Sequence, residues 1–169
     1  MQHLSKSAAS SYLRNFVFGV EDSLVSTVGL LSGVAIAGVP RATIFLTGAV
    51  LICVEAISMA AGSFLSEYSV EEFEKKSEVS AGRSIADASI MFVSYFLSGI
   101  IPLAPYLFFE AEEALQISVV ATLCVLFALG AVGARLARVR VWRTGVRMVL
   151  IGGVAILAGV VVGQLIDSL

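Results

Sequence analysis

The sequence contains few of the residues on which most enzymes and metal-binding soluble domains depend. Its 169 residues include one histidine, two cysteines, one tryptophan and three prolines, and only 14% are charged. His3 lies near the N-terminus, Cys53 and Cys124 stand alone in apolar runs, and CxxC, HExxH, GxSxG and phosphate-binding glycine loops are absent. We therefore predict no disulfide, no catalytic residue and no cofactor-binding residue. We expect neither an enzyme nor a nucleic-acid-binding protein.

Apolar residues dominate the chain. They make up 58% of the residues, and the mean hydropathy is +0.95. Crossing a hydrocarbon core about 30 Å thick takes about 20 helical residues. Five runs are long enough, near residues 15–37, 43–66, 87–109, 115–134 and 145–166. Short connections and the lack of strand alternation predict one all-α integral membrane domain over 1–169, without a removed signal peptide.

Basic residues are distributed unevenly between the two sides that five crossings create. Of the 11 Lys and Arg residues, only Arg41 falls on the side opposite to the others. The positive-inside rule places the basic side in the cytoplasm. We therefore predict a cytoplasmic N-terminus and an external C-terminus, with the acidic loop around Glu110 facing outward. The arginines of 135–147 could also bind anionic lipid, but topology is the preferred interpretation.

The first span carries an acid inside an otherwise apolar run. Asp22 belongs to a helical stripe of small or polar residues at steps of four and three: Asn15, Gly19, Asp22, Ser26, Gly29 and Gly33. Ionisable groups inside a bilayer are costly and usually face a partner, a water-filled cavity or an ion path. The stripe predicts one face toward one partner surface, with a GxxxG pair for close packing. A packing seam that merely tolerates Asp22 is the alternative.

The second span has a similar stripe with another acid and a thioether: Gly48, Ile52, Glu55, Met59, Gly62 and Ser66. At 1.5 Å per residue, Asp22 lies roughly 10 Å from one membrane face and Glu55 roughly 18 Å from the other, which is a similar depth in a core of roughly 30 Å. Two carboxylates and a sulfur suit a first-row divalent ion. Met59 as a core filler is an equal alternative.

A row of carboxylates follows the second span. Glu67, Glu71, Glu74 and Glu78 recur at four, three and four residues in the short connection 67–86. This spacing predicts an acidic face on a helix that continues from span two at the cytoplasmic mouth. The row is either a solvated helix face or a vestibule that concentrates cations, so these glutamates are weaker metal-site candidates.

Several segments resemble the vacuolar iron transporter family, whose members carry ferrous and manganous ions out of the cytosol. The similarity lies in FGVEDSLVSTVGLLSGVA of span one, AISMAAGSFLSEYS of span two, FLSGIIPLAPYLF of span three and RTGVRMVLIGGVAILAGVVVGQLI at the end. SMAAG and PLAPY are the most specific segments. The chain departs from the family pattern in two respects. Ser63 stands where the family commonly has Glu, and Glu55 stands where a small residue is usual. The short connection 67–86 also leaves no room for the cytoplasmic metal-binding domain of larger members.

The resemblance implies a homodimer of five-helix protomers with the ion path at the two-fold interface of the first helices. Asp22 then matches the pathway acid and Met59 the pathway methionine, and two-fold symmetry doubles each group around one ion. Protons are the counter-ion in the family, and a buried carboxylate can bind a metal ion or a proton. Glu55 is expected to assist Asp22.

We therefore predict export of Fe(II) or Mn(II) from the cytoplasm in exchange for protons. The expected partners are the metal ions, protons, the lipid bilayer and a second copy of the chain, without a resident cofactor. A passive cation channel is the alternative within transport. A non-transporting assembly or metal-sensing subunit, whose buried acids only lock helices together, is the alternative from another class. The short length and missing targeting segment favour a prokaryotic cell membrane over a vacuole.

Overall fold

The computed structural model describes the backbone of residues 2–168 and the side chains of residues 9–168, so His3 and Lys6 lie outside the described side chains. Its helices are α1 (Gln2–Ile36), α2 (Arg41–Lys75), α3 (Gly82–Leu103), α4 (Pro105–Phe108), α5 (Ala111–Leu136) and α6 (Val141–Asp167). Residues 2–168 contain no strand, and five helices are long and apolar enough to cross a membrane. The prediction of an all-α protein with five candidate membrane spans is confirmed.

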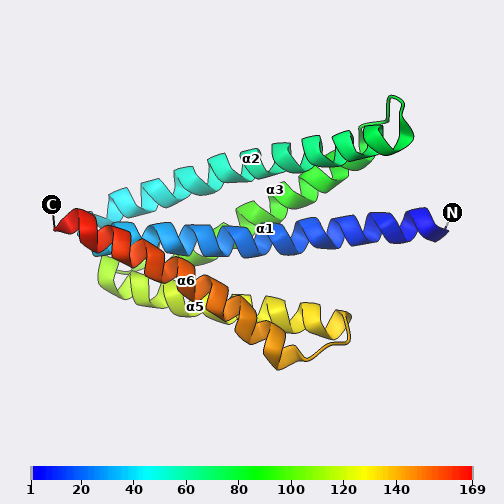
Figure 1. Cartoon of the computed structure of the whole chain (residues 1–169). Helices are drawn as coiled ribbons and strands as arrows, with labels where there is room; N and C mark the ends of the chain where they lie inside the picture. Colours follow the sequence, from blue (N-terminus) through cyan, green and yellow to red (C-terminus); the bar gives the residue numbers. More distant parts are fainter. Residues whose placement is uncertain (1, 169) are drawn as a thin grey trace.

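The helices α1 and α2 are longer than the predicted spans. α1 begins at Gln2, and α2 continues to Lys75, where Lys76 adopts a left-handed conformation and its N–H bonds to the carbonyl of Glu72. Both helices project beyond the α5–α6 turn at the end where the N-terminus lies (Figure 1). Three predicted glutamates of the acidic row therefore lie on α2. Glu78 lies beyond the helix end, so the prediction of four glutamates on one helix face is wrong for that residue.

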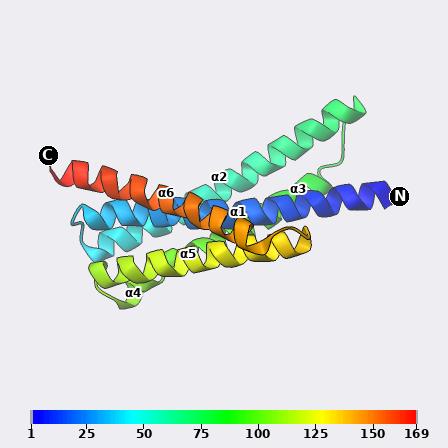
Figure 2. The same cartoon turned by 60° about the horizontal axis from the view of Figure 1, so that its bottom comes forward.

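The central position in the bundle belongs to α1. In Figure 1, α2 lies on one side of α1 and α5 and α6 lie on the other, while Figure 2 shows α6 crossing over α1. α3 also packs against α1. Leu24, Val28 and Leu31 of α1 have no exposed surface, and Ser23 and Thr27 are buried beside them. Because small and apolar side chains alternate along α1, neighbouring helices can cover it on several faces. The orientation of any group on α1 is thus set by several packing partners.

Glycines bring α1 and α6 into backbone contact. A Cβ on Gly159 would lie 2.0 Å from the carbonyl oxygen of Gly29, and one on Gly163 would lie 2.2 Å from that of Gly33. Gly19, by contrast, packs against α3, where a Cβ would lie 2.2 Å from Ser94 Oγ. The prediction that the whole stripe of α1 faces one partner surface is therefore wrong. Neighbouring helices cross α1 at an angle, so the stripe meets different helices at different heights.

The third predicted span is divided near its end. α3 stops at Leu103 and the short α4 begins at Pro105, because the missing N–H of Pro105 cannot continue the hydrogen-bond ladder. The carbonyl of Pro102 instead accepts a hydrogen bond of 2.8 Å from Ser118 Oγ of α5. A carbonyl left without a helical partner at such a break must find another one inside a membrane. Ser118 supplies that partner for Pro102 and fixes the bend against α5.

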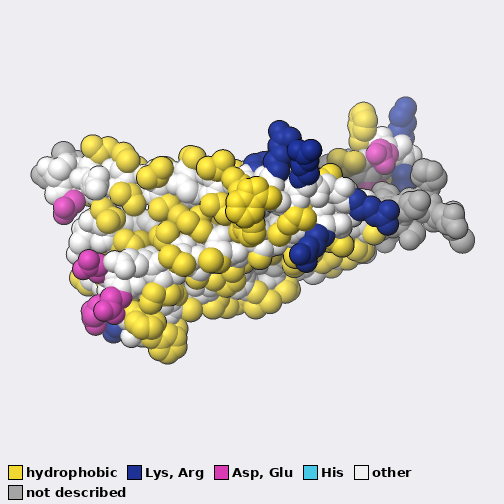
Figure 3. Space-filling view, turned by 90° about the horizontal axis from the view of Figure 1, so that it is seen from below, with side chains coloured by type: hydrophobic (Ala, Val, Ile, Leu, Met, Phe, Trp, Pro, Cys, Tyr) yellow, Lys and Arg dark blue, Asp and Glu magenta, His cyan; other side chains and the backbone are white. Residues whose placement is uncertain are grey.

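Charged side chains gather toward the two ends of the molecule, and an extensive hydrophobic surface lies between them (Figure 3). The α5–α6 turn carries the arginine cluster, whereas the opposite end carries the acidic α4–α5 connection, where Arg41 Nη1 lies 3.6 Å from Glu110 Oε1. The exposed side chains in the middle include Val54, Ile57 and Leu157, at 60%, 63% and 64% exposure. Such a surface matches a lipid bilayer bounded by polar ends.

The α1–α6 contact predicts a sharp difference between two glycines of α6. In Gly159→Ala the new methyl group collides with the backbone of α1, so we expect a loss of about 1–3 kcal/mol of stability. Gly153→Ala is the matched control, because nothing lies within 4 Å of its Cβ position. Thermal unfolding in detergent should show a lower midpoint for Gly159→Ala alone. Equal midpoints in the two variants would contradict the close contact.

Candidate metal site

Two acids from different helices lie at one level of the bundle. Asp22 of α1 and Glu55 of α2 are both half-buried, and the Tyr95 hydroxyl contacts both Glu55 and Ser26, which is one turn along α1 from Asp22. This agrees with the similar depths that the sequence predicted for the two carboxylates. Two carboxylates that share one poorly solvated level repel each other when both are ionised. A bound cation or proton relieves that repulsion.

Tyr95 of α3 completes this group and was not predicted from the sequence. Its fully buried ring carries a hydroxyl 3.3 Å from Glu55 Oε2 and 2.8 Å from Ser26 Oγ. The hydroxyl donates to the carboxylate, while Ser26 can accept or donate in the remaining direction. The carboxylate of Glu55 is therefore held by α3 and α1 together, although it originates from α2.

Met59 lies one turn further along α2 and lines a neighbouring groove of about 670 Å³ between α1, α2 and α3. Asn15 and Phe18 line it from α1, and Met91 lines it from α3. The antiparallel register explains the neighbourhood, because Asn15 bonds to Ser63 while Ser26, further along α1, shares the Tyr95 hydroxyl with Glu55. Met59 therefore adjoins the acid pair on the side of the N-terminal end of the molecule.

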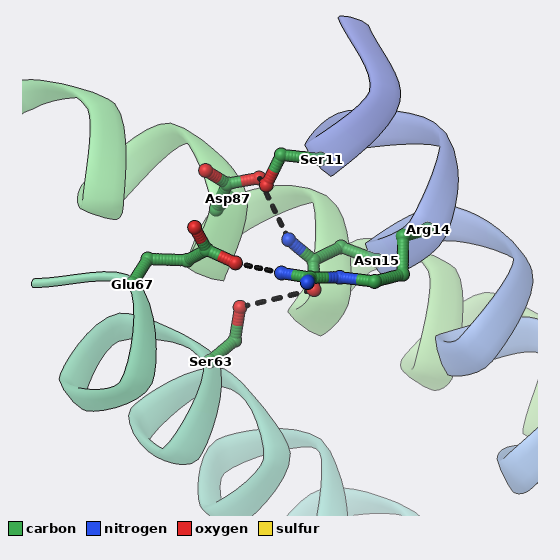
Figure 4. A network of polar contacts seen from close by, with 6 residues as sticks. All are labelled: Ser11, Arg14, Asn15, Ser63, Glu67 and Asp87. Atoms are coloured by element: carbon green, nitrogen blue, oxygen red, sulfur yellow. Dashed lines mark hydrogen bonds and ion pairs between the residues drawn. The ribbon is translucent and has the colours of Figure 1, made fainter. Parts of the chain in front are cut away.

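A buried polar network joins three helices at that end (Figure 4). Asp87 of α3 has no exposed surface, and its Oδ1 accepts hydrogen bonds from Ser11 Oγ at 2.8 Å and Asn15 Nδ2 at 2.7 Å. Asn15 Oδ1 in turn accepts a bond of 3.3 Å from Ser63 Oγ of α2. One asparagine side chain thus connects α3 to α2 through α1.

The acidic row is partly neutralised by basic side chains. Glu67 forms an ion pair with Arg14 of α1, and Glu71 forms one with Lys75 of α2. A polar pocket of about 310 Å³ at this end is lined by both acidic and basic residues, among them Glu74 and Arg83. The vestibule interpretation is weakened, since paired carboxylates attract a cation less strongly than free ones.

Sequence reasoning found the acids of α1 and α2 but missed the contribution of α3. A recognisable signal was present, because polar residues and a methionine recur there at helical spacing: Ser84, Asp87, Met91, Ser94, Tyr95 and Ser98. All six are buried. A polar face on a membrane helix must meet other polar groups, so this stripe marks the third wall of the site.

Within the described residues, no group of three or more His, Cys, Asp or Glu side chains is close enough to hold a metal ion. One protomer therefore offers the Asp22–Glu55 pair with hydroxyl, amide and thioether groups around it. Divalent first-row ions accept such mixed oxygen and sulfur ligands. A full coordination shell then needs water or groups from a second copy of the chain.

Comparison with known proteins agrees with this arrangement. A profile of the VIT family matches residues 13–87 and 72–164, which together span most of the chain. The chain belongs to the VIT family. The matched region contains the carboxylate pair, Tyr95, the groove and the three-helix polar network. The five apolar helices of this family member accordingly belong to an integral membrane protein.

The curated relatives cover most of the chain as well. "Vacuolar iron transporter homolog 4" of Arabidopsis thaliana is 32% identical over 160 residues, which are 87% of this chain and 79% of the relative. "Vacuolar iron transporter homolog 2" of the same plant is 31% identical over 159 residues, covering 87% and 80%. "Vacuolar iron transporter homolog 5" of Oryza sativa subsp. japonica is 30% identical over 167 residues, covering 90% and 79%.

The distinctive segments of this VIT family member lie at the site. Ser58, Met59 and Gly62 of the SMAAG segment line the groove, and Ser63 directly after it bonds to Asn15. The hydroxyl at position 63 therefore contributes a hydrogen bond where the family resemblance leads one to expect a carboxylate. Glu55, two turns earlier on α2, is the acid that α2 places beside Asp22.

The Tyr95–Glu55 contact is testable by a double-mutant cycle. Tyr95→Phe removes the hydroxyl, Glu55→Gln removes the charge, and the double variant reports their coupling. We expect a coupling energy of about 0.5–1.5 kcal/mol, since Tyr95→Phe removes a partly buried hydrogen bond and Glu55→Gln weakens it by removing the charge of the acceptor. Chemical denaturation in mixed micelles measures it. Strictly additive losses would show that the contact contributes nothing to stability.

Proposed function

We propose that this protein transports divalent transition-metal ions across a membrane, with Fe(II) or Mn(II) as the cargo. The observation that supports the proposal most strongly is the Asp22–Glu55 pair, held inside a membrane-crossing bundle of a VIT family chain. Acids at such a position are costly and are typical of ion paths. The names of the relatives point to iron.

The ligand chemistry is consistent with first-row divalent ions. Asp22 is the primary ligand, Glu55 assists it from α2, and Met59 supplies a softer donor nearby. Carboxylate oxygens alone suit Mg(II), Ca(II) and Mn(II), whereas a thioether favours softer ions such as Fe(II). Both Fe(II) and Mn(II) remain possible cargoes with this mixed set.

Proton exchange follows from the same carboxylates. A metal ion binds their ionised forms, and proton binding at either acid removes a negative charge from the pair. The two acids lie at one level of the bundle, so loss of the metal ion restores their repulsion and favours proton uptake. Metal and proton therefore compete for one place, which is the physical requirement of antiport.

A homodimer would complete the site. The side chains of Leu13 and Phe18 on α1 are 48% exposed, although α1 is the most central helix of the protomer. Contact between two copies through this face would cover them and double Asp22 and Met59 around the two-fold axis. We propose export from the cytoplasm, on the positive-inside argument. The host membrane is proposed to be a prokaryotic cell membrane.

Asp22→Asn tests the transport proposal directly. The variant keeps the side-chain volume but cannot release a proton, so we expect Fe(II) and Mn(II) uptake into proteoliposomes to fall by about tenfold or more. Asp167→Asn is the control, because Asp167 is exposed at the end of α6. Normal folding of Asp22→Asn with undiminished uptake would instead favour a non-transporting subunit.

Coupling to protons separates a carrier from a channel. In sealed proteoliposomes, an antiporter should change the internal pH when Fe(II) or Mn(II) is added outside, and lower external pH should slow uptake because protons compete for Asp22. A pH-sensitive dye inside the vesicles measures the first effect. Metal uptake without a pH change would support the passive channel.

A further inference from the structure

The groove between α1, α2 and α3 holds polar and sulfur atoms that the acid pair does not use. Asn15, Met59, Ser63, Glu67 and Met91 are among the residues that line its volume of about 670 Å³. It adjoins the polar pocket at the N-terminal end, since Arg14 and Glu67 line both. The groove therefore extends from that pocket to Met59, which is one turn of α2 from Glu55.

Asp87 determines which atom of Asn15 faces the groove. A carboxylate accepts hydrogen bonds only, so the Asn15 amide nitrogen must point to Asp87, at 2.7 Å. The amide oxygen consequently points toward α2, where it accepts the bond from Ser63 Oγ. An amide oxygen is a ligand for hard and borderline cations, whereas an amide NH₂ group would repel them.

Met91 adds a second thioether to the same groove. Its side chain is only 2% exposed, and its sulfur would lie 3.2 Å from a Cβ on Gly19. The absence of a side chain at Gly19 thus leaves room for the sulfur between α1 and α3. Met59 lines the groove from α2. Two thioethers that line one groove favour softer divalent ions over harder ones.

Charge at the groove also favours a cation. Asp87 Oδ2 is buried and has no hydrogen-bond partner among the described residues, so the negative charge behind Asn15 is not fully compensated by hydrogen bonds. At the mouth, the Glu67 side chain is 16% exposed and is paired with Arg14, whose side chain is 65% exposed (Figure 4). The guanidinium stays in contact with water, so an arriving divalent ion can take its place beside Glu67.

We propose that this groove is a second cation site, in which Asn15 Oδ1, Met59 Sδ and Met91 Sδ are ligands. Asp87 is a positioning residue that acts through Asn15. The inference rests on the proposed transport function and deepens it, because the site selects Fe(II) over Mn(II) before the ion reaches Asp22. Met59 serves both sites in turn.

The test measures equilibrium binding of Fe(II), under anaerobic conditions, and of Mn(II) to the full chain in detergent. The Asp22→Asn background is used so that the remaining binding reports on the groove. Met91→Leu should weaken Fe(II) binding about tenfold and Mn(II) binding by less than about threefold, because only a soft ligand is lost. Met148→Leu is the matched control, since Met148 packs against Gly130 at the α5–α6 contact.

Asp87→Asn should weaken the binding of both ions by about tenfold or more, because the Asn15 amide is no longer held in one orientation. A second variant exchanges the two residues, Asn15→Asp with Asp87→Asn. It keeps the hydrogen bond between positions 15 and 87 and places a carboxylate oxygen in the groove. Both ions should therefore bind more tightly to it than to the Asp22→Asn variant with Asn15 and Asp87 in place. If Asp87 had only a structural role, the exchange variant would bind the two ions no more tightly than the Asp22→Asn variant does.

An unchanged Fe(II) to Mn(II) ratio in Met91→Leu, an exchange variant that binds no more tightly, or no Fe(II) binding at all in the Asp22→Asn background would each overturn the proposal. Uptake by the unmodified chain in proteoliposomes is measured in parallel. Uptake with unaltered binding in the variants would refute the groove site and leave the transport function standing. Altered binding without uptake would support the site and refute the transport function.

Discussion

The close approach of α1 to its neighbours is the constraint on which the rest of the structure depends. Gly29 and Gly33 admit the backbone of α6, and Gly19 admits Ser94 and Met91 of α3. In a bilayer, helices gain little from hydrophobic burial, so packing distance and polar contacts decide how they associate. Because α1 is covered on several sides, Asp22 cannot rotate toward lipid. The glycines of α1, which let its neighbours pack closely, therefore hold Asp22 at the level of Glu55.

Polar contacts then fix the relative heights of the helices. The Asp87–Asn15–Ser63 network joins α3, α1 and α2 at one level, and Tyr95 joins the same three helices about two to three turns away through Ser26 and Glu55. Sliding any one helix by a turn would leave several of these groups buried without partners, which is costly in a poorly solvated place. The two levels of contact therefore set the register in which Asp22 meets Glu55.

Much of this fold could be predicted from the sequence, because the bilayer imposes strong length and hydropathy rules. The five spans and the pairing of Asp22 with Glu55 follow from helix rise and apolar run length alone. The extension of α1 back to Gln2 could not be predicted this way, since it lies outside any apolar run. The partners of Gly29 and Asp87 depend on helix crossing angles, which periodicity does not encode. Tyr95 and Met91 escaped notice because an aromatic residue and a methionine in an apolar run normally indicate packing.

The arrangement of charges suggests how an ion could lose its water in stages. At the mouth, the partly buried Glu67 and Glu71 are paired with the more exposed Arg14 and Lys75, so in the proposed path a cation there takes the place of hydrated basic side chains. Deeper, the available atoms are neutral oxygens and sulfurs beside the buried Asp87, and deeper still lies the pair Asp22 and Glu55. Removing water from a divalent ion is expensive, so each loss must be offset by a protein ligand at the same depth. If ligands were present only at Asp22, the ion would have to lose its water before reaching them, and this loss would be a free-energy barrier. In the proposed transport, a stepwise supply of ligands from three helices lowers that barrier, and this gives the polar face on α3 a role beside the acids of α1 and α2.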